Sequence, residues 1–518
     1  MAAQLPDYVA SAQPLGKDAR VPWYANIAPT YAGIMLWFVF WHDVPVGSNL
    51  SGGLGQYSTF AGGSLAGGLA IALLGLVIAA LICHFLFYVV PGMLGMKTGL
   101  PLYIVGTSTY GVQGGFLMPG FIMGLLQFGW LAVNAFFAGI LLCAPWGHGA
   151  GTVQHGVVAT LWAVAAAFMG LKGIQYVAKV ASILPLVPFV ILIWLVVSSI
   201  GSVGSFDAEK AVAAGEGKTY QEVVSEEVTH KEIGDPEETE DKDSGITTRE
   251  VAVKEVKITK TKTLTTKGAL PLWGIIAMIC TYVVGFFATA GAAGTDIAMN
   301  ARNAKDVQMG GIFGIALATI YAGGLALLFV VGMHGTGELG DGAVLRATGL
   351  MPAAVGEETS QVLMYLLAIA AFPAACFSAF IAANSFKTTL PKVNPFITVG
   401  IGTAFACFLA VSGYAGNAIG VFKIIGASFG PICGAMAADY LLSGRKWAGP
   451  RAGFNPAGWI SWAVGFVVGA ADFIPALSGK IPAPPVAAFV VGFVLYFALA
   501  QAGLESEKID MPQRIDKE

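Results

Sequence analysis

Apolar runs alternate with short polar segments along almost the whole chain. A helix needs about 20 apolar residues to cross the hydrocarbon core of a bilayer, and about twelve of the runs approach or exceed that length. They lie at residues 26–42, 66–91, 116–143, 154–171, 177–201, 270–294, 309–333, 360–384, 394–412, 416–442, 457–475 and 483–501. The pattern predicts an all-α integral membrane protein with about 12 transmembrane helices.

The apolar pattern stops between the fifth and sixth spans, where residues 202–269 are rich in charge. Within residues 249–266, Val, Ile or Thr alternates with charged side chains, which is typical of a β-strand. This insert is either a small β-hairpin or a solvated, partly disordered loop. The predicted segments are an N-terminal tail at 1–25, spans 1–5 at 26–201, the insert, spans 6–10 at 270–442, spans 11–12 at 443–501 and a C-terminal tail at 502–518.

Composition supports the membrane assignment. The 518 residues are 56% hydrophobic and 11% charged, whereas soluble proteins carry about 25% charged residues. The net charge of -3 is small and scattered, which argues against a nucleic-acid partner. The six cysteines lie singly in apolar runs, without the paired spacing of a disulfide framework or a metal site.

Basic residues in the short loops indicate the orientation, because cytoplasmic loops of membrane proteins are enriched in Lys and Arg. If both termini are cytoplasmic, the short outer loops hold little more than Arg346 and Lys480. We therefore expect a multi-pass protein of the plasma (cytoplasmic or inner) membrane with both termini in the cytoplasm. The charged insert then lies on the outer face.

Two spans contain sequences that favour a break. Span 1 runs through His42 and Asp43 into Pro45 and Gly47, and span 6 carries AGAAG at residues 290–294. Transporters with inverted repeats bind their substrate at mid-membrane beside such broken helices. These spans open the first and second groups of five, so the breaks suit a five-plus-five repeat. Ordinary helix ends with Gly stops are the alternative.

Trp130 and Asn134 lie one helical turn apart in the uncharged segment 116–143. Polar groups inside a span are costly and often functional. An aromatic ring beside an amide suits a planar ligand that forms hydrogen bonds. Alternatively, the Trp belongs to an interfacial belt and the Asn bonds a neighbouring helix.

Enzymatic motifs are not convincing in this chain. Residues 426–430 read GASFG, a formal match to the G-x-S-x-G nucleophile motif, but they lie inside an apolar helical span rather than a strand-to-helix elbow. The sequence has no HExxH motif, no P-loop and no clustered metal ligands. We expect a protein that is not an enzyme and carries no cofactor.

Four segments, taken in order, resemble one protein family. They are Gly99-Leu100-Pro101 through Tyr110-Gly111-Val112-Gln113-Gly114 to Pro119 and Gly129-Trp130; Thr295-Asp296 through Ala301-Arg302-Asn303-Ala304-Lys305-Asp306; Ser378 with Asn384; and Gly430-Pro431 through Ala438-Asp439-Tyr440 with Arg445. Together they resemble the nucleobase:cation symporter-1 family, which includes cytosine permeases, purine–cytosine permeases and the bacterial hydantoin transporter. The resemblance implies the leucine-transporter-like fold, a five-plus-five inverted repeat with broken helices 1 and 6.

The resemblance also implies a substrate site. Trp130 matches the tryptophan that stacks on the substrate ring, and Asn134 matches the amide one turn later. Counting back nine residues from Asp296 places Phe287 at the aromatic that closes the other face, and Asn384 matches the asparagine that bonds the heterocycle edge. Stacking between two aromatic faces and pairing with amides suits a planar heterocycle.

The cation site implied by the resemblance is incomplete here. Ala375 matches a carbonyl ligand of Na⁺ and Ser378 a hydroxyl ligand, but Ala379 stands where the family has a second hydroxyl. Either water or a span 1 carbonyl completes a Na⁺ site, or the coupling ion is H⁺. His42 and Asp43 are candidates for a proton-linked role, unless they simply face the outer water at a span end.

The function predicted from these features is import of a nucleobase or related nitrogen heterocycle by Na⁺ or H⁺ symport and alternating access. Asn134 favours the cytosine and purine side of the family. The expected partners are this small molecule and the lipid bilayer. One alternative is a transporter of the same fold for another solute, such as an amino acid. Another is a receptor or sensor that binds without transporting and uses the outer insert for docking.

Overall fold

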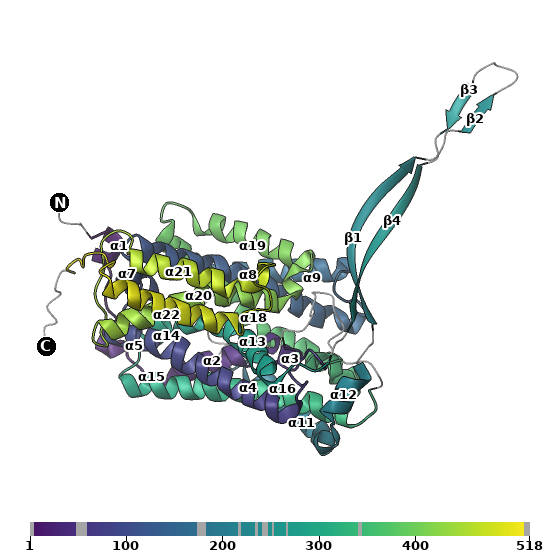
Figure 1. The fold of residues 1–518 in the computed structure, drawn as a ribbon, viewed down its shortest axis with the longest axis horizontal. Coiled ribbons are helices and arrows are strands. Elements are labelled where there is room, and N and C mark those ends of the chain that lie inside the picture. The colour runs from purple at the N-terminus through teal and green to yellow at the C-terminus, as the bar shows by residue number, and fades with distance from the viewer. Residues whose placement is uncertain are drawn as a thin grey trace.

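The computed structural model describes several stretches of the chain, most of them helical and gathered into one bundle (Figure 1). The described residues are 5–47, 60–172, 183–215, 219–233, 237–240, 247–250, 253–265, 268–339 and 344–511. Residues 177–182 of the fifth predicted span therefore lie outside them, as do short parts of the insert.

Helices occupy the predicted spans. Within the described residues, 9 helical runs are long and apolar enough to cross a membrane. These are α4 to α5 (Gly68–Thr98), α8 with its flanking turns (Phe116–Trp146), α9 (Val153–Lys172), α11 with its final turn (Leu186–Ser205), α13 (Leu272–Ala292), α15 to α16 (Ala304–Gly335), α18 (Glu357–Thr389), α20 (Ala418–Leu442) and α22 (Pro484–Gln501). Two shorter apolar helices, α19 (Pro395–Val411) and α21 (Pro456–Gly469), and the broken first span complete the set.

The first span breaks earlier than its sequence suggests. It consists of α2 (Ile27–Met35) and α3 (Phe38–Asp43), so the break lies at Leu36 and Trp37 and not at Pro45 and Gly47. Two side chains satisfy backbone groups around it: the Trp41 indole of α3 donates to the Leu36 carbonyl at 3.1 Å, and the Tyr282 hydroxyl of the sixth span donates to the Phe40 carbonyl at 2.6 Å. Tertiary contacts stabilise this break, since neither of its two residues is a Gly or Pro.

The sixth span breaks within the predicted AGAAG segment. Helix α13 ends at Ala292, and after Ala293 the short helix α14 (Gly294–Ala298) continues the chain. Helix α14 lies very close to α5 (Val89–Thr98), because a Cβ on Gly95 would come within 2.0 Å of the Thr295 carbonyl oxygen. Only glycine fits this crossing without moving α14.

The inner and outer helices of the bundle differ in burial. Helices α13 and α20 are mostly buried, whereas α9, α11 and α22 leave most of their surface uncovered. The uncovered side chains are large and apolar, such as Leu161 and Phe168 on α9 and Trp194 on α11. Exposed apolar surface of this extent marks a face that another apolar phase covers, here the lipid.

The two ends of the bundle carry different structures (Figure 1). Helix α1 (Asp7–Ala10) and the C-terminal end of α22 lie at one end, which we call the termini end. The insert projects from the opposite end, the hairpin end. There α12 (Ala208–Gly215) precedes β1 (Thr219–Ile233), which pairs antiparallel with β4 (Val253–Thr265); β2 (Glu237–Glu240) pairs with β3 (Thr247–Glu250) beyond them. Strand β4 lies within the region of alternating sequence.

Two of the segments that carry the family resemblance serve to hold the termini end together. Asp439 on α20 accepts hydrogen bonds from Ser108 and Thr109 and pairs with Arg451 at 3.0 Å. In the second segment, the Asn303 side chain caps α15 (Ala304–Gly311), where Arg302 pairs with Asp306 at 2.7 Å. These motif residues therefore have structural roles.

Hydrogen bonds also join α2 to the sixth span at this end. The Asn26 amide donates to the Ile297 carbonyl at 2.7 Å and to the Asn300 side chain at 2.8 Å. The Val21 N–H donates to the Asn300 carbonyl at 2.8 Å, and the Tyr31 hydroxyl donates to the Ala290 carbonyl at 2.8 Å. The half-helix α2 is thus tied to both pieces of span 6.

Candidate functional site

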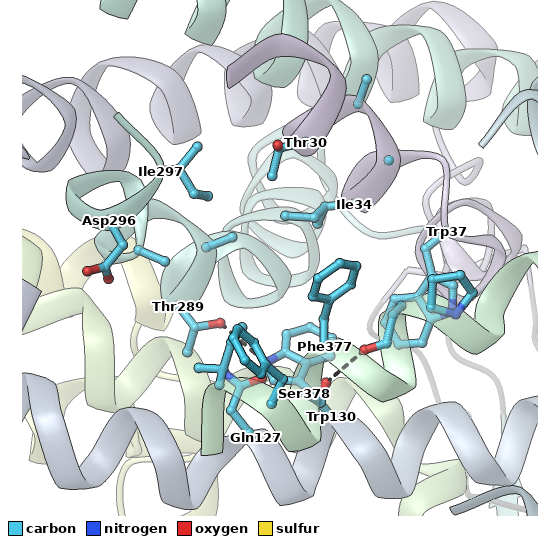
Figure 2. A pocket seen from close by; sticks show the side chains of 18 of the residues that line it. Thr30, Ile34, Trp37, Gln127, Trp130, Thr289, Asp296, Ile297, Phe377 and Ser378 are labelled. Carbon is cyan, nitrogen blue, oxygen red and sulfur yellow. Dashed lines mark hydrogen bonds between the residues drawn. The ribbon is translucent and has the colours of Figure 1, made fainter. Parts of the chain in front are cut away.

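A cavity of about 1300 Å³ lies between the broken helices and α8 (Ile122–Cys143) and α18 (Figure 2). Along the first span its lining extends from Ala25 to Phe38, and along α18 from Leu367 to Lys387. The lining includes residues of the termini end that are exposed, among them Pro29 and Lys387. The cavity therefore reaches from mid-bundle to the termini end.

Aromatic side chains form the deep wall of the cavity. The Trp130 ring lies 5.7 Å from the ring of Trp37, 5.2 Å from Phe286 and 5.2 Å from Phe422, measured between centroids. Its indole N–H donates to the Thr289 hydroxyl at 3.2 Å, which fixes the ring plane. Trp130 lines the cavity and is partly exposed there, so a molecule in the cavity can reach its ring.

The aromatic of the sixth span is displaced by one residue from the prediction. Phe287 does not line the cavity: it is fully buried and packs against Tyr31, with ring centroids 5.7 Å apart. Phe286 lines the cavity instead. One residue rotates a helical side chain by about 100°, so counting back from Asp296 across the helix break gave the wrong face.

Two amides project from α8 on the same face as Trp130. Asn134 lines the cavity, but its amide donates to the Ala371 carbonyl at 3.0 Å and accepts from the Trp162 indole at 2.9 Å. Asn134 therefore joins α8 to α9 and α18, as expected for an Asn that bonds neighbouring helices. Its amide retains one N–H and one oxygen lone pair for a ligand. Gln127 was missed, although its spacing of three residues before Trp130 places it on the same face.

Trp37 is a second residue missed by the sequence analysis. It occupies the break between α2 and α3 with an extended backbone, and its side chain lines the cavity. Its indole N–H is buried and has no acceptor among the described residues. A buried donor without a partner costs about 1–3 kcal/mol, so a ligand acceptor placed here would gain that energy.

The residues predicted on the eighth span lie at different depths. Asn384 and Ser378 line the cavity, and Asn384 is exposed towards its termini end. Ala375 is fully buried and does not line the cavity. The Ser378 hydroxyl donates to the Ala374 carbonyl of its own helix at 3.2 Å. Within the described chain, no three His, Cys, Asp or Glu side chains gather as metal ligands.

His42 and Asp43 lie beyond the cavity, towards the hairpin end. Both are buried, at 2% and 0% exposure, so they do not face outer water as one alternative held. Asp43 forms a two-pronged ion pair with Arg346, at 2.6 and 3.2 Å, and the guanidinium also lies over the Phe137 ring. His42 bonds Thr348 at 3.1 Å. We call Asp43 and Arg346 the latch, because they join span 1 to the segment before span 8.

One carboxylate lies on the cavity itself. Asp296, on α14, lines it and is partly exposed, and its Oδ1 accepts the backbone N–H of Leu102 at 2.9 Å. This bond caps α6 (Leu102–Val105), which follows Gly99-Leu100-Pro101. Two segments of the family resemblance therefore meet at Asp296.

These observations define a helical membrane protein with two broken spans around a central cavity. No protein-family model matches the chain, and no curated protein matches it. Solved structures match it over nearly its full length.

Mhp1, described as a nucleobase-cation-symport-1 family transporter in a closed conformation with bromovinylhydantoin bound, matches 96% of this chain and 95% of its own, with a TM-score of 0.55 at 14% identity. The inward facing conformation of Mhp1 matches 98% of this chain and 96% of its own, with a TM-score of 0.57 at 14% identity. Identity this low establishes the shared fold alone. The predicted fold class, a leucine-transporter-like five-plus-five arrangement with broken helices 1 and 6, is confirmed.

Proposed function

We propose that the chain is a secondary transporter of the nucleobase:cation symporter-1 type, which imports a nucleobase or related nitrogen heterocycle with a coupling cation. The observation that carries the proposal is the cavity of about 1300 Å³ beside two broken spans, with tryptophans and amides on its walls. Ligand pockets usually measure about 300–1000 Å³, so this volume holds a small ring and the aqueous path that leads to it.

The walls supply what a planar heterocycle needs. We assign the stacking surface to Trp130, with Phe286 in place of Phe287 as the aromatic of span 6. Gln127 and the remaining positions of Asn134 offer donors and acceptors to the ring edge, and the Trp37 indole offers one donor. Asn384, nearer the opening, would bond the heterocycle during entry or release. An aliphatic amino acid would make less use of this wall, because it has no ring edge for these groups.

We further propose that the termini end is cytoplasmic, which assigns the protein to the plasma membrane with both tails inside. The Lys and Arg residues of the short loops favour this orientation. The cavity then opens towards the cytoplasm, and the latch closes the outer side. The described conformation would be the one that releases substrate into the cell.

The test is a thermal-shift screen of the purified protein against cytosine, uracil, adenine, guanine, hypoxanthine, allantoin and hydantoin, in parallel Na⁺ and K⁺ buffers. A ligand that binds only the folded state stabilises it by about 2.7 kcal/mol at a hundred times its Kd, so a true substrate will raise the Tm. Counterflow of the labelled hit in proteoliposomes then separates transport from sensing. Binding without counterflow would favour a receptor, and no hit at all would contradict the substrate class.

A further inference from the structure

The cavity contains few charged groups. Among the described residues that line it, Asp296 carries a negative charge and Lys387 a positive one. The titratable pair suggested by the sequence, His42 and Asp43, does not line the cavity, and Asp43 is neutralised by Arg346 at 2.6 Å. Asp296 is thus the carboxylate that water in the cavity can reach.

No cation pairs with Asp296 in the described part of the chain. The nearby cations are engaged elsewhere: Arg302 pairs with Asp306 at 2.7 Å, Arg20 donates to the Ala301 carbonyl at 3.2 Å, and Lys97 donates to the Arg445 carbonyl at 2.6 Å. The titratable and charged groups on the elements that pack against α14 are Tyr31 on α2, Tyr88 and Lys97 on the second span, Tyr103 on α6, and Cys280 and Tyr282 on α13. Across the cavity, Lys387 on α18 is the charged residue of the lining.

The oxygens available for a sodium ion are few. Ala379 lacks the second hydroxyl, so this turn of α18 offers the Ser378 hydroxyl oxygen, whose proton is donated to the Ala374 carbonyl at 3.2 Å. At the span 1 break, the Leu36 carbonyl accepts the Trp41 indole N–H at 3.1 Å and keeps one lone pair. Sodium prefers several oxygen ligands, whereas a proton needs a single basic oxygen.

We infer that Asp296 is the carrier of the coupling proton, an inference that rests on the proposed function. Its Oδ2 takes a proton from water while the cavity opens to the outer side and releases it to water at the termini end. A carboxylate without a cation partner is costly to enclose away from water, whereas the neutral acid is not. Closure of the cavity around substrate therefore favours the protonated form, which couples the two movements.

The neutral variant Asp296→Asn tests this coupling, because its amide oxygen still accepts the Leu102 N–H and preserves the cap of α6. In proteoliposomes with an inward proton gradient of one pH unit, the unmodified protein should accumulate labelled cytosine about tenfold at one proton per substrate. Asp296→Asn should lose this accumulation but retain counterflow, with a rate that no longer depends on pH. The control Asp207→Asn, which alters an exposed loop carboxylate, should behave like the unmodified protein.

Accumulation by Asp296→Asn equal to that of the unmodified protein would overturn the inference. Loss of both counterflow and cytosine binding in this variant would also overturn it, because Asp296 would then serve binding or folding. Loss of gradient-driven uptake alone supports it.

A second readout needs no substrate and so separates this inference from the proposed function. Infrared titration of the purified protein should reveal a protonated-carboxyl band that Asp296→Asn removes and Asp207→Asn retains. If the unmodified protein transports no nucleobase but shows this band, the proposed function fails and the proton site stands. A band that persists in Asp296→Asn overturns the proton site.

Discussion

The two ends of the bundle are built in opposite ways. At the hairpin end, Asp43 is fully buried and pairs with Arg346, which also packs over the Phe137 ring. At the termini end, Asp296 faces the cavity with no ion-pair partner among the described residues, and Asn384 and Lys387 are exposed.

At the hairpin end the charged side chains therefore pair with each other, whereas those of the cavity lining at the termini end face water. Separating Asp43 from Arg346 exposes two groups that both need a partner or solvent, so opening of the hairpin end must hydrate them together. Among the described residues that line the cavity, opening of the termini end separates no such ion pair. Opening the hairpin end is therefore expected to cost more free energy than opening the termini end.

The largest effect is expected from removing one partner of the latch. Arg346→Met leaves Asp43 buried without a cation, which typically costs about 3–5 kcal/mol. Thermal unfolding of the ligand-free protein measures the loss. Lys423→Met is the matched control, because it leaves Asp472, which is 20% exposed, without its cation and should cost less.

The double variant Asp43→Asn/Arg346→Met sharpens the same test. Removing both charges leaves no unpaired ion, so part of the stability should return. If Arg346→Met unfolds at the same temperature as the unmodified protein, the latch does not hold the hairpin end closed.

The next effect is expected at Trp130, on the deep wall of the cavity. Trp130→Ala removes the stacking surface and should weaken heterocycle binding by roughly a hundredfold, or about 2.8 kcal/mol, measured by calorimetry. Trp194→Ala, which alters a tryptophan on the exposed face of α11, should leave the affinity unchanged. Retained affinity in Trp130→Ala would remove the ring from the binding site.

The two amides of α8 should behave differently. Asn134→Ala leaves the Trp162 indole without an acceptor and removes the second hydrogen bond of the Ala371 carbonyl, so it should lower the stability of the ligand-free protein by about 1–3 kcal/mol as well as weaken binding. Gln127→Ala should weaken binding at nearly unchanged ligand-free Tm. Equal losses of stability in both variants would contradict the assignment of separate roles.

The smallest effect is expected from Ala379→Ser, which restores the hydroxyl that a sodium site would use. If a proton is the coupling ion, the Na⁺ dependence of transport should not change, because Asp296 lies on another helix. A rise in apparent Na⁺ affinity would show that a depleted sodium site operates here, and would weaken the assignment of Asp296.

The sequence predicts best the structural features that depend on residues close together along the chain. Apolar length alone located the spans, and AGAAG located the break in span 6. The break in span 1 was misplaced because Leu36 and Trp37 carry no Gly or Pro signal; Trp41 and Tyr282 supply the missing hydrogen bonds.

The candidate site was only partly predictable, because several of its residues are positioned by contacts with distant parts of the chain. The position of Trp130 followed from its own helix, but the choice between Phe286 and Phe287 depends on how α13 is rotated against its neighbours. The partner of Asp43 lies 303 residues further along the chain, and no local pattern connects the two. Gln127 is the exception, because helical spacing from Trp130 would have found it.

The hydrogen bonds that tie α2 to span 6 limit how many parts of the molecule can move independently. Asn26, Val21 and Tyr31 join the two half-helices that border the opening, and to separate them would break four bonds worth about 1 kcal/mol each. The two half-helices are therefore expected to move together, so that a change of charge at Asp296 would act on both.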